Sequence, residues 1–335
     1  MHDDPIPLKE VAELLNVKVE RLRRAAWDKR LAAERRGRDW LVRPSEVRRF
    51  LREGGHAPAY AQARPRPEGG TPSMGRVIAV AITKGGVGKS TTALNLGAAF
   101  AEHGLRVLLV DCDHQCSLTL TVGVSVEEAR YSLYTAIMDY LSTFEPRLEE
   151  GVVRTALGFD LVPASVRLTR ADKELNFAPQ REYVIQKLLA PLLPRYDIVL
   201  LDTEPTTNNL VTNALVAAYE VLLPLEPEPI ALESLAVTLE DIAQIRRSGL
   251  NPNLTISGVL LTKVDQRLNV HQQAVAYTRT QVGATVPIFE TMIKRSVRFP
   301  ESQGMNQSVL QYEPRGEGAM AYRQLAAEVL DGWGE

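Results

Sequence analysis

The first apolar positions of the chain recur at helical spacing and predict two short helices near the N-terminus. The positions that share one face of the stretch PLKEVAELL are Leu8, Val11, Leu14 and Leu15. Asn16 stands where a left-handed residue would end that helix. The helical pattern then restarts, and its inward positions are Val19, Leu22 and Ala26. We therefore expect two helices joined by a tight turn.

A hairpin and a third helix complete this N-terminal pattern. The stretch LAAERRGRDWLV has Gly37 at its centre and Trp40, Leu41 and Val42 on the return strand. The stretch PSEVRRFL opens a further helix, with Pro44 in its first turn. Together these elements predict a small winged helix-turn-helix domain over residues 1–53.

A different composition follows between Gly54 and Gly75. The stretch GGHAPAYAQARPRPEGGTPSMG is rich in Gly, Pro and Ala and has no apolar periodicity that could bury a face. We interpret residues 54–75 as a flexible linker.

Longer apolar runs alternate with helical patterns over residues 76–335. Most of these runs are rich in branched residues and lack strict alternation, as expected of strands that are covered on both faces. They span residues 76–82, 106–111, 159–164, 196–202, 220–226 and 254–265. The alternation predicts an α/β fold with a doubly wound, mostly parallel sheet, whose ligands bind at the carboxyl ends of the strands.

Composition and charge narrow the class of protein. The 335 residues allow about two or three domains. No run of about 18 apolar residues occurs, and the polar, acidic start excludes a secretory signal. The only cysteines, Cys112 and Cys116, fit a reducing, cytoplasmic location. Residues 1–53 hold 14 Lys and Arg against 10 Asp and Glu, whereas the remainder is acidic. This basic segment suggests contact with a polyanion, although a solvated charged face is the plain alternative.

A phosphate-binding loop lies in the stretch TKGGVGKSTT, which follows a predicted strand and opens a helix. Its glycines let backbone N–H groups surround phosphate oxygens, and the helix directs its positive end at the same anion. Lys89 would hold the β- and γ-phosphates, and the Ser90 hydroxyl would bind Mg²⁺. The expected nucleotide-binding positions are Gly85, Gly86, Val87, Gly88, Lys89, Ser90 and Thr91.

A second lysine precedes these glycines. Lys84 followed by GGVGKST resembles the deviant Walker A motif of the ParA/MinD family of positioning ATPases, although Thr83 replaces the first glycine of the strict P-loop pattern. The resemblance extends from Arg76 to about Leu330. In that family the early lysine reaches the phosphates bound by a partner subunit. The resemblance therefore implies ATP with Mg²⁺, a homodimer in the ATP state, weak ATPase activity, and a catalytic role in trans for Lys84 beside Lys89.

The stretch LLVDCDHQCSLT resembles the switch segment of that family. The resemblance places Asp111 near Mg²⁺ and assigns to Asp113 the positioning of the attacking water. His114 replaces the usual proline, and Cys116-Ser117 replaces the usual glycine-asparagine, which puts the rate of hydrolysis in doubt.

The stretch YDIVLLDTEP resembles a Walker B strand, with Asp202 holding Mg²⁺ directly or through water. Glu204 replaces a common proline, and it either points away from phosphate or slows turnover. The stretch IKRSVRFPESQG resembles a basic loop of the family but is two residues shorter before Gly304, so its adenine contacts stay open.

Two alternative assignments concern the ligands. Cys112, His114 and Cys116 alternate as metal ligands could, but they lack a fourth partner, and Cys112 is better interpreted as a small buried residue. The stretch LTKVD resembles a guanine-reading motif through Lys263 and Asp265. The double-lysine loop nevertheless favours ATP over GTP.

Two groups of basic residues are candidates for DNA binding. Residues 1–53 resemble MerR/excisionase-type domains, which implies contacts in the groove or to phosphate through Arg21, Arg23, Arg24 and Arg30. The implied wing contacts are Arg35, Arg36 and Arg38. Such domains also serve as plain protein-interaction modules. Resemblance to partition ATPases adds a sequence-independent group formed by Arg267, Lys294, Arg295 and Arg298.

The resemblance as a whole implies a ParA-type ATPase for plasmid or chromosome partition, located in the cytoplasm on the nucleoid. A ParB-like centromere-binding protein would stimulate hydrolysis, and the N-terminal domain could bind an operator. One rival is a MinD-like membrane ATPase, which the acidic stretch AYRQLAAEVLDGWGE and Thr83 disfavour. The other is a transcriptional regulator that senses ATP with little hydrolysis. The sequence does not indicate the cargo.

Overall fold

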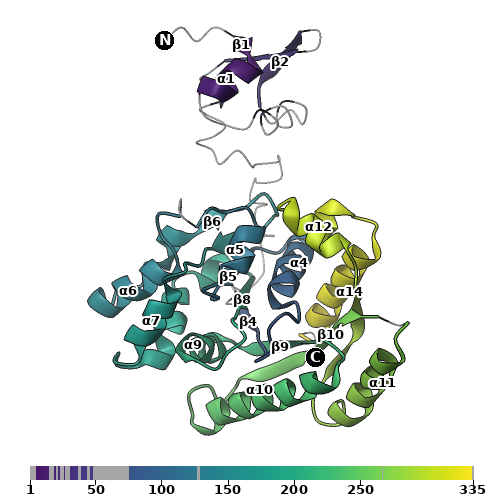
Figure 1. Ribbon diagram of the computed structural model, residues 1–335. Coiled ribbons are helices and arrows are strands. Elements are labelled where there is room, and N and C mark those ends of the chain that lie inside the picture. The colour runs from purple at the N-terminus through teal and green to yellow at the C-terminus, as the bar shows by residue number, and fades with distance from the viewer. Residues whose placement is uncertain are drawn as a thin grey trace, which may run out of the picture. The chain divides into compact units, whose positions relative to one another are not determined.

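The computed structural model divides the chain into two compact units, Met1–Glu68 and Gly69–Glu335 (Figure 1). It describes residues 5–14, 19, 22, 26, 31–36, 39–43, 46–47, 75–126, 129–265 and 267–333.

The N-terminal unit contains a small antiparallel sheet and a helix. The elements whose bounds the described residues define are β1 (Ile6–Pro7), α1 (Leu8–Leu14), β2 (Ala33–Arg36) and β3 (Asp39–Val42), and residues 19, 22, 26, 46 and 47 are also helical. The sheet order is β1-β3-β2, and Glu34 pairs with Leu41 across the hairpin. The predicted hairpin is therefore confirmed. Strand β1 was not predicted, because two residues are too short to show a period.

The apolar faces expected from the sequence form the core of this unit. The side chains of Leu8, Val11, Leu22, Ala26 and Val47 are buried, and Val19 packs against them. Their burial confirms the inward positions of the predicted helices. Leu15, Asn16, Gly37, Pro44 and linker residues 54–74 lie outside the described residues.

The larger unit is built on an eight-stranded sheet in the order β11-β10-β9-β4-β8-β5-β7-β6. The strands are β4 (Arg76–Val80), β5 (Val107–Asp111), β6 (Val153–Arg154), β7 (Asp160–Val162), β8 (Ile198–Asp202), β9 (Glu220–Leu225), β10 (Thr255–Val264) and β11 (Ile288–Lys294). All neighbours are parallel except β6 and β7. The predicted doubly wound, mostly parallel fold is confirmed.

Helices cover both faces of this sheet. They are α4 (Lys89–Glu102), α5 (Ser117–Thr121), α6 (Leu133–Thr143), α7 (Leu168–Leu175), α8 (Val184–Leu189), α9 (Asn209–Ala217), α10 (Pro229–Arg247), α11 (Asn269–Tyr277), α12 (Arg298–Gly304), α13 (Val309–Tyr312) and α14 (Glu317–Asp331). No described helix combines the length and the apolar composition that crossing a bilayer requires.

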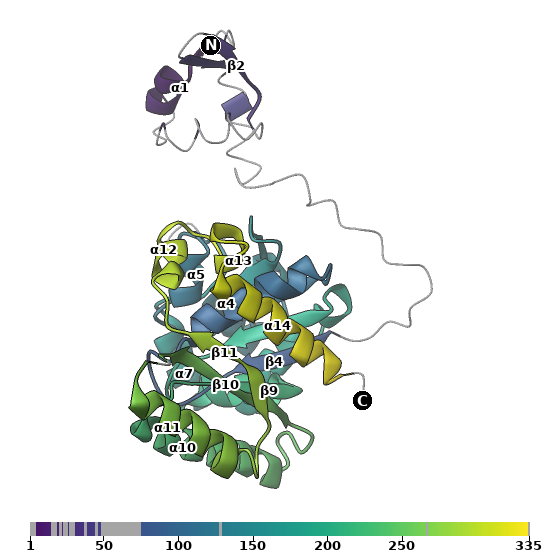
Figure 2. The same cartoon turned by 90° about the vertical axis from the view of Figure 1, so that its right-hand side faces the viewer.

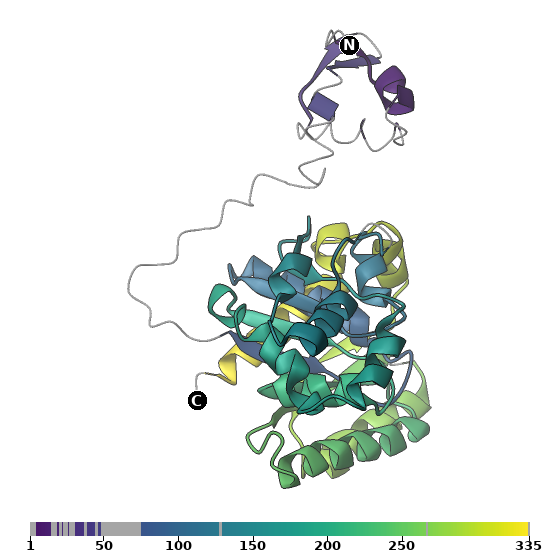
Figure 3. The ribbon, with the colours of Figure 1, turned by 90° about the vertical axis from the view of Figure 1, so that its left-hand side faces the viewer.

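Alternate residues of each central strand enter two separate apolar cores. On β4, Val77 and Ala79 pack with residues of α6 to α10, whereas Ile78 and Val80 pack with α4 and α14. Figure 2 shows α4 and α14 lying across the sheet, and the teal helices of the other layer face the viewer in Figure 3. Burial on both faces explains why these strands read as continuous apolar runs.

All six apolar runs contain strands, but the two edge strands β6 and β11 were not predicted. Residues 293–304 were expected to form one basic loop. They instead contain the end of β11 at Lys294 and the start of α12 at Arg298. Strand β11 lies at the edge of the sheet, and buried and more exposed residues alternate along it. Its sequence therefore lacks the continuous apolar run that identified the central strands.

The order of the strands places a topological switch at β4. After β4 the chain builds β5, β6 and β7 on one side of it, inserts β8 next to it, and then continues through β9 to the opposite edge. Ligands of such sheets bind where the winding direction reverses, beyond the carboxyl ends of the strands. The glycine-rich loop follows β4 at this point.

Candidate nucleotide-binding site

The glycine-rich loop leads from β4 into the N-terminus of α4. Gly86 and Gly88 adopt φ angles of 75° and 92°, where a side chain would be strained. Gly88 caps α4 without any side-chain hydrogen bond to the first N–H groups of the helix. A helix start that no side chain caps, preceded by glycines, is a suitable binding site for phosphate.

The flanks of the loop are attached to neighbouring elements. The Thr83 N–H donates to Thr238 Oγ1 on α10 (3.1 Å), and the Thr83 hydroxyl donates to the Ser234 carbonyl (3.0 Å). The Thr262 hydroxyl at the end of β10 donates to the Val87 carbonyl (2.8 Å). Thr83 therefore anchors the loop through a hydroxyl that the glycine of the strict pattern could not supply.

The two lysines of the loop point to different partners. Lys89 is buried, and its Nζ donates to the carbonyl oxygen of Lys84 (2.9 Å). Burial lowers the pKa of Lys89, while nearby carboxylates, Asp202 first, oppose this shift. Lys84 Nζ instead lies 2.7 Å from Oε2 of Glu228, the residue that precedes α10. This hydrogen bond lowers the pKa of Glu228.

Asp111 ends β5 and is fully buried among hydrogen-bond donors. Its Oδ2 accepts from the N–H (2.9 Å) and hydroxyl (2.6 Å) of Thr119, and its Oδ1 accepts from the Asp113 N–H (3.1 Å). Burial raises the pKa of Asp111 to about 6, although these donors oppose the shift. Thr119 also accepts from the Ala164 N–H (2.9 Å). The role of Thr119 was missed, because its partners become neighbours only in the fold.

Asp202 ends β8 in register with Asp111, but its surroundings differ. Neither carboxylate oxygen has a hydrogen-bond partner among the described residues, although the side chain is fully buried. Burial and the charge of Asp111 raise its pKa well above its usual value, and the Ser90 hydroxyl, which lies nearby but outside hydrogen-bond geometry, opposes that shift. A buried carboxylate without partners beside a hydroxyl is a fitting donor set for Mg²⁺. The residues predicted to bind Mg²⁺, Ser90, Asp111 and Asp202, therefore lie together. Asp111 already accepts hydrogen bonds from its own chain.

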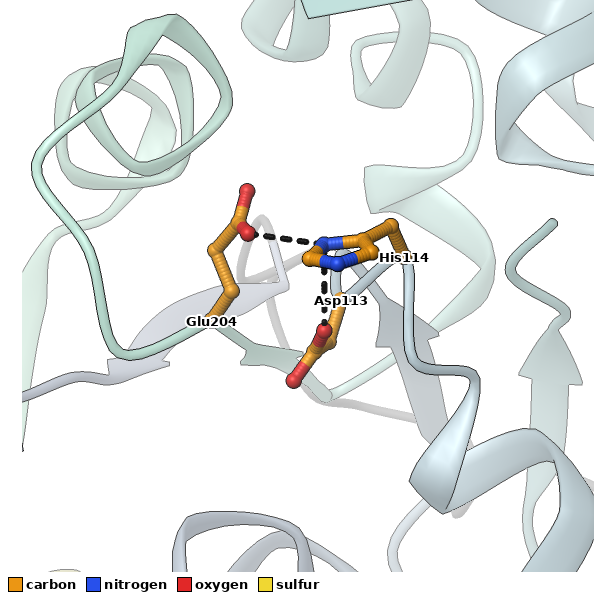
Figure 4. A group of neighbouring side chains, drawn as sticks. All are labelled: Asp113, His114 and Glu204. Atoms are coloured by element: carbon orange, nitrogen blue, oxygen red, sulfur yellow. Dashed lines mark hydrogen bonds and ion pairs between the residues drawn. The ribbon is translucent and has the colours of Figure 1, made fainter. Parts of the chain in front are cut away.

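His114 and Glu204, which both depart from the family pattern, contact each other (Figure 4). His114 Nδ1 lies 2.9 Å from Glu204 Oε2 and 3.7 Å from Asp113 Oδ1. Glu204 is buried, and its other oxygen accepts from the Asn208 amide. Glu204 therefore points toward the imidazole of the switch segment. The expected water-positioning residue, Asp113, also accepts from the Gln115 N–H (2.8 Å).

The cysteines of the switch segment are not arranged as metal ligands with His114. Cys112 Sγ donates weakly to the Val110 carbonyl, and Cys116 Sγ to the His114 carbonyl. Both thiols are buried, and burial raises the pKa of Cys116 to about 12. The interpretation of Cys112 as a small buried residue is confirmed. Cys116 adopts a left-handed φ of 56° before α5, where the family pattern has glycine.

The candidate guanine-reading residues already have partners. The Lys263 ammonium donates to the carbonyl oxygen of Gly86 in the phosphate loop. Asp265 accepts from the side chain of Arg267 (2.7 Å), and this hydrogen bond lowers its pKa well below the usual range. Near the expected adenine side, Gln303 Nε2 donates to Thr91 Oγ1 (2.9 Å) and ties α12 to α4.

The basic residues expected to bind DNA in the larger unit are each paired with an acidic residue. Arg267 pairs with Asp265, Lys294 with Glu317, Arg295 with Glu226, and Arg298 with Glu301. In the N-terminal unit, Arg35 and Arg36 belong to β2, and the Arg35 side chain is exposed. Arg21, Arg23, Arg24, Arg30 and Arg38 lie outside the described residues.

A mostly parallel sheet whose switch-point loop ends in Gly88-Lys89-Ser90 at the start of a helix is the arrangement of P-loop nucleoside-triphosphate-binding proteins. Residues 75–256, more than half of the chain, match a family model described as an AAA domain. Residues 8–55 match one described as a helix-turn-helix domain.

Relatives and a solved structure narrow the class. This chain is 41% identical over 255 residues to the chromosome-partitioning ATPase Soj of Thermus thermophilus. The aligned region covers 76% of this chain and 95% of that protein. This chain is also 38% identical over 258 residues to the chromosome partitioning protein ParA of Caulobacter vibrioides. That alignment covers 76% of this chain and 94% of the relative. A 32% identical structure, cobyrinic acid a,c-diamide synthase from Mycobacterium smegmatis with bound ADP and magnesium, has a TM-score of 0.67 and covers 78% of this chain and 96% of that one.

The chain belongs to the ParA/Soj family of P-loop partition ATPases and carries an additional N-terminal helix-turn-helix domain. The family resemblance, the fold and the ATPase class predicted from the sequence are thereby confirmed. The roles of individual site residues stay predictions.

Proposed function

We propose that this chain is an ATP-dependent partition ATPase that dimerises across bound nucleotide and binds DNA in that state. The observation that carries the proposal is the divergence of the two lysines, Lys89 toward its own loop and Lys84 toward Glu228. The Lys84 ammonium bonds to Glu228, which lies outside the glycine-rich loop of its own chain. It is therefore available to complete the phosphate site of a partner.

The residues at the ends of β4, β5 and β8 fit one molecule of Mg²⁺–ATP. The N–H groups of the loop and Lys89 would bind the phosphates, and Ser90 with Asp202 would hold Mg²⁺. The metal would supply charge neutralisation when bound. Asp113 would accept a hydrogen bond from the attacking water and hold it in line. The bound ADP and magnesium of the M. smegmatis relative support this choice of ligands.

Dimerisation would require Lys84 to leave Glu228. The lysine side chain is 20% exposed and the glutamate 40% exposed, so their ion pair contributes at most about 1 kcal/mol. A triphosphate with several oxygens is a stronger partner than one half-exposed carboxylate. Closure of two chains across nucleotide can therefore break the Lys84–Glu228 ion pair at small cost.

The test measures molecular mass by light scattering in a variant that cannot hydrolyse ATP. We expect Asp113→Ala to form dimers with Mg²⁺–ATP and to remain monomeric with ADP. Adding Lys84→Ala should abolish dimers while nucleotide binding persists. Lys89→Ala is the matched control, because it should abolish nucleotide binding itself. A dimer of normal strength in the Lys84→Ala protein would overturn the role of Lys84.

We further propose that the ATP-bound dimer binds DNA without sequence preference through Arg267, Lys294, Arg295 and Arg298. Each of them must exchange an acidic partner of its own chain for a phosphate, so binding of DNA by a single chain is weak. The dimer is favoured because it presents two such groups to the same DNA. Charge reversal at Arg295 and Arg298 should weaken binding equally on all sequences. Arg247→Glu is the control, since Arg247 is an exposed arginine paired with Glu240 on α10.

The N-terminal unit is proposed to bind a specific site such as an operator, and a ParB-like partner is proposed to stimulate hydrolysis on nucleoid DNA. The helix-turn-helix match and the exposed Arg35 on β2 support the first proposal. Reversing the charge of Arg35 and Arg36 should remove a sequence-specific footprint and leave nonspecific binding intact. ATP turnover with and without DNA distinguishes this enzyme from a regulator that only senses ATP.

A further inference from the structure

His114 and Glu204 create a cluster of metal-ligand atoms on the switch side of the site. The nearest atoms of Asp113, His114 and Glu204 all lie within 4.8 Å of one another. Figure 4 shows the three side chains converging from the ends of two neighbouring strands. None of them belongs to the Ser90–Asp202 pair that fits Mg²⁺.

We propose that Asp113, His114 and Glu204 form a second cation site, which binds a transition-metal ion of the Zn²⁺ class. Imidazole nitrogens and carboxylate oxygens are both zinc ligands, and catalytic zinc sites combine three protein ligands with an open fourth position. A tetrahedral ion with bonds of about 2.0–2.1 Å holds its ligand atoms about 3.4 Å apart. The observed separations from His114 Nδ1, 2.9 Å to Glu204 and 3.7 Å to Asp113, lie on either side of that value.

Both Glu204 and His114 are held in place from outside the cluster. Asn208 donates to the Glu204 oxygen that faces away from His114. Gln115 Nε2 lies 2.7 Å from His114 Nε2, the ring nitrogen opposite the cluster. When a metal replaces the proton on Nδ1, Nε2 becomes a donor, and the Gln115 amide turns its oxygen toward it. Such outer partners fix the direction of metal ligands and raise their affinity.

The charge balance of the site also favours a second cation. Asp113 and Glu204 are both buried beside Asp111 and Asp202, whose raised pKa values reduce their own share of the negative charge, and Lys89 is a buried ammonium close to Asp113 and Glu204. Mg²⁺–ATP brings more negative than positive charge, so it leaves this excess unbalanced. An imidazole ligand suits Zn²⁺ and other transition metals, whereas Mg²⁺ prefers oxygen ligands.

Occupation of the site would restrain Asp113. A carboxylate bound to a metal is no longer free to orient water for attack on the γ-phosphate. The bound ion would therefore slow hydrolysis and prolong the ATP state. This consequence rests on the proposed ATPase function, whereas metal binding itself does not.

The binding test uses the full chain without nucleotide, treated with chelator and then titrated with zinc against a chromophoric competitor. We expect binding of a single zinc ion, weakened at least about 10-fold in His114→Asn and in Glu204→Gln. His103→Asn is the matched control, because His103 is an exposed imidazole at the end of α4. Parent-like affinity in His114→Asn, or a parent protein without measurable affinity, overturns the proposal.

A second measurement guards against variants that fold poorly. The melting temperature of each protein is compared with and without zinc, so that each variant is its own reference. We expect zinc to raise the melting temperature of the parent and of His103→Asn, but not that of His114→Asn. An equal rise in all three proteins would place zinc elsewhere and overturn the site.

Turnover tests the consequence for hydrolysis. With excess Mg²⁺–ATP, zinc should slow the parent severalfold and leave the His114→Asn protein unchanged relative to its own zinc-free rate. Zinc binding without slower turnover would support the site and overturn its inhibitory role. If the chain hydrolyses no ATP at all, the proposed ATPase function fails while the binding test still decides the metal site.

Discussion

Asp111 and Asp202 occupy paired positions at the ends of adjacent strands, yet only one of them is satisfied by the protein. Asp111 receives donors from Thr119 and from the backbone of Asp113. Asp202 receives none from the described residues. The same residue type at the same register therefore serves two purposes. Asp111 is hydrogen-bonded to the switch segment, whereas Asp202 is buried without a donor among the described residues and its pKa is raised.

The largest expected effect tests this difference directly. Asp202→Asn should reduce ATP turnover about 10²–10³-fold, because it removes a charge aimed at the metal. In the absence of Mg²⁺ the same change should raise the free energy of unfolding by about 1–3 kcal/mol, because it removes an unpaired buried carboxylate.

Asp111→Asn should have a less favourable effect on stability. It removes a buried charge whose pKa is raised, but it also places an amide NH₂ beside existing donors, and these two contributions oppose each other. The free energy of unfolding of Asp111→Asn should therefore lie about 1–3 kcal/mol below that of Asp202→Asn in urea unfolding near pH 7 with chelator present. Equal free energies of unfolding in the two variants would remove the contrast.

The pH dependence of stability follows from the raised pKa of Asp111, which is about 6 compared with an ordinary value of 3.8. A carboxyl whose folded pKa is raised binds its proton more tightly in the folded state. Its contribution is therefore lost as pH rises from about 4 to about 6, by up to about 3 kcal/mol without metal. Asp202, whose pKa is also raised, extends the loss to higher pH.

This loss is measured as the difference between the parent and the variants Asp111→Asn and Asp202→Asn over that pH range. Each substitution should flatten the fall in unfolding free energy, and saturating Mg²⁺ should flatten it in the parent. A slope that neither variant alters would assign the titration to other carboxylates.

The sequence predicted where these carboxylates lie, but not how they differ. The apolar runs placed Asp111 and Asp202 at strand ends, and the family resemblance assigned both to Mg²⁺. Whether either has a partner depends on contacts across the fold, such as Thr119 with Ala164. The direction of Glu204 likewise depends on His114, which is 90 residues away in the chain. Pattern and resemblance cannot supply such contacts, because they carry no information on distant pairs.

Substitution of Thr119 should have a smaller effect on stability, and it tests the hydrogen bonds that Asp111 accepts. Thr119→Val removes the shortest donor to Asp111 and the acceptor of the Ala164 N–H, while the side-chain volume hardly changes. Two buried groups lose a partner, so we expect a loss of about 2 kcal/mol in unfolding free energy. The double variant with Asp111→Asn should lose less than the sum, because the two residues share one hydrogen bond. Full additivity would show that the hydroxyl does not support Asp111.

Substitution of Thr203 should have the smallest effect. It tests whether the position of Asp202 depends on the hydrogen bond that joins β8 to β4. The Thr203 hydroxyl donates to the Val80 carbonyl on β4 (2.9 Å) and is buried directly after Asp202. Thr203→Val removes one neutral hydrogen bond and should lower the unfolding free energy by about 1 kcal/mol. Because the substitution leaves Asp202 itself unchanged, the stabilisation by Mg²⁺–ATP should stay at the parent value. A variant that lost this stabilisation would show that the position of Asp202 depends on the tie between β8 and β4, and that its missing partners alone do not define the ligand site.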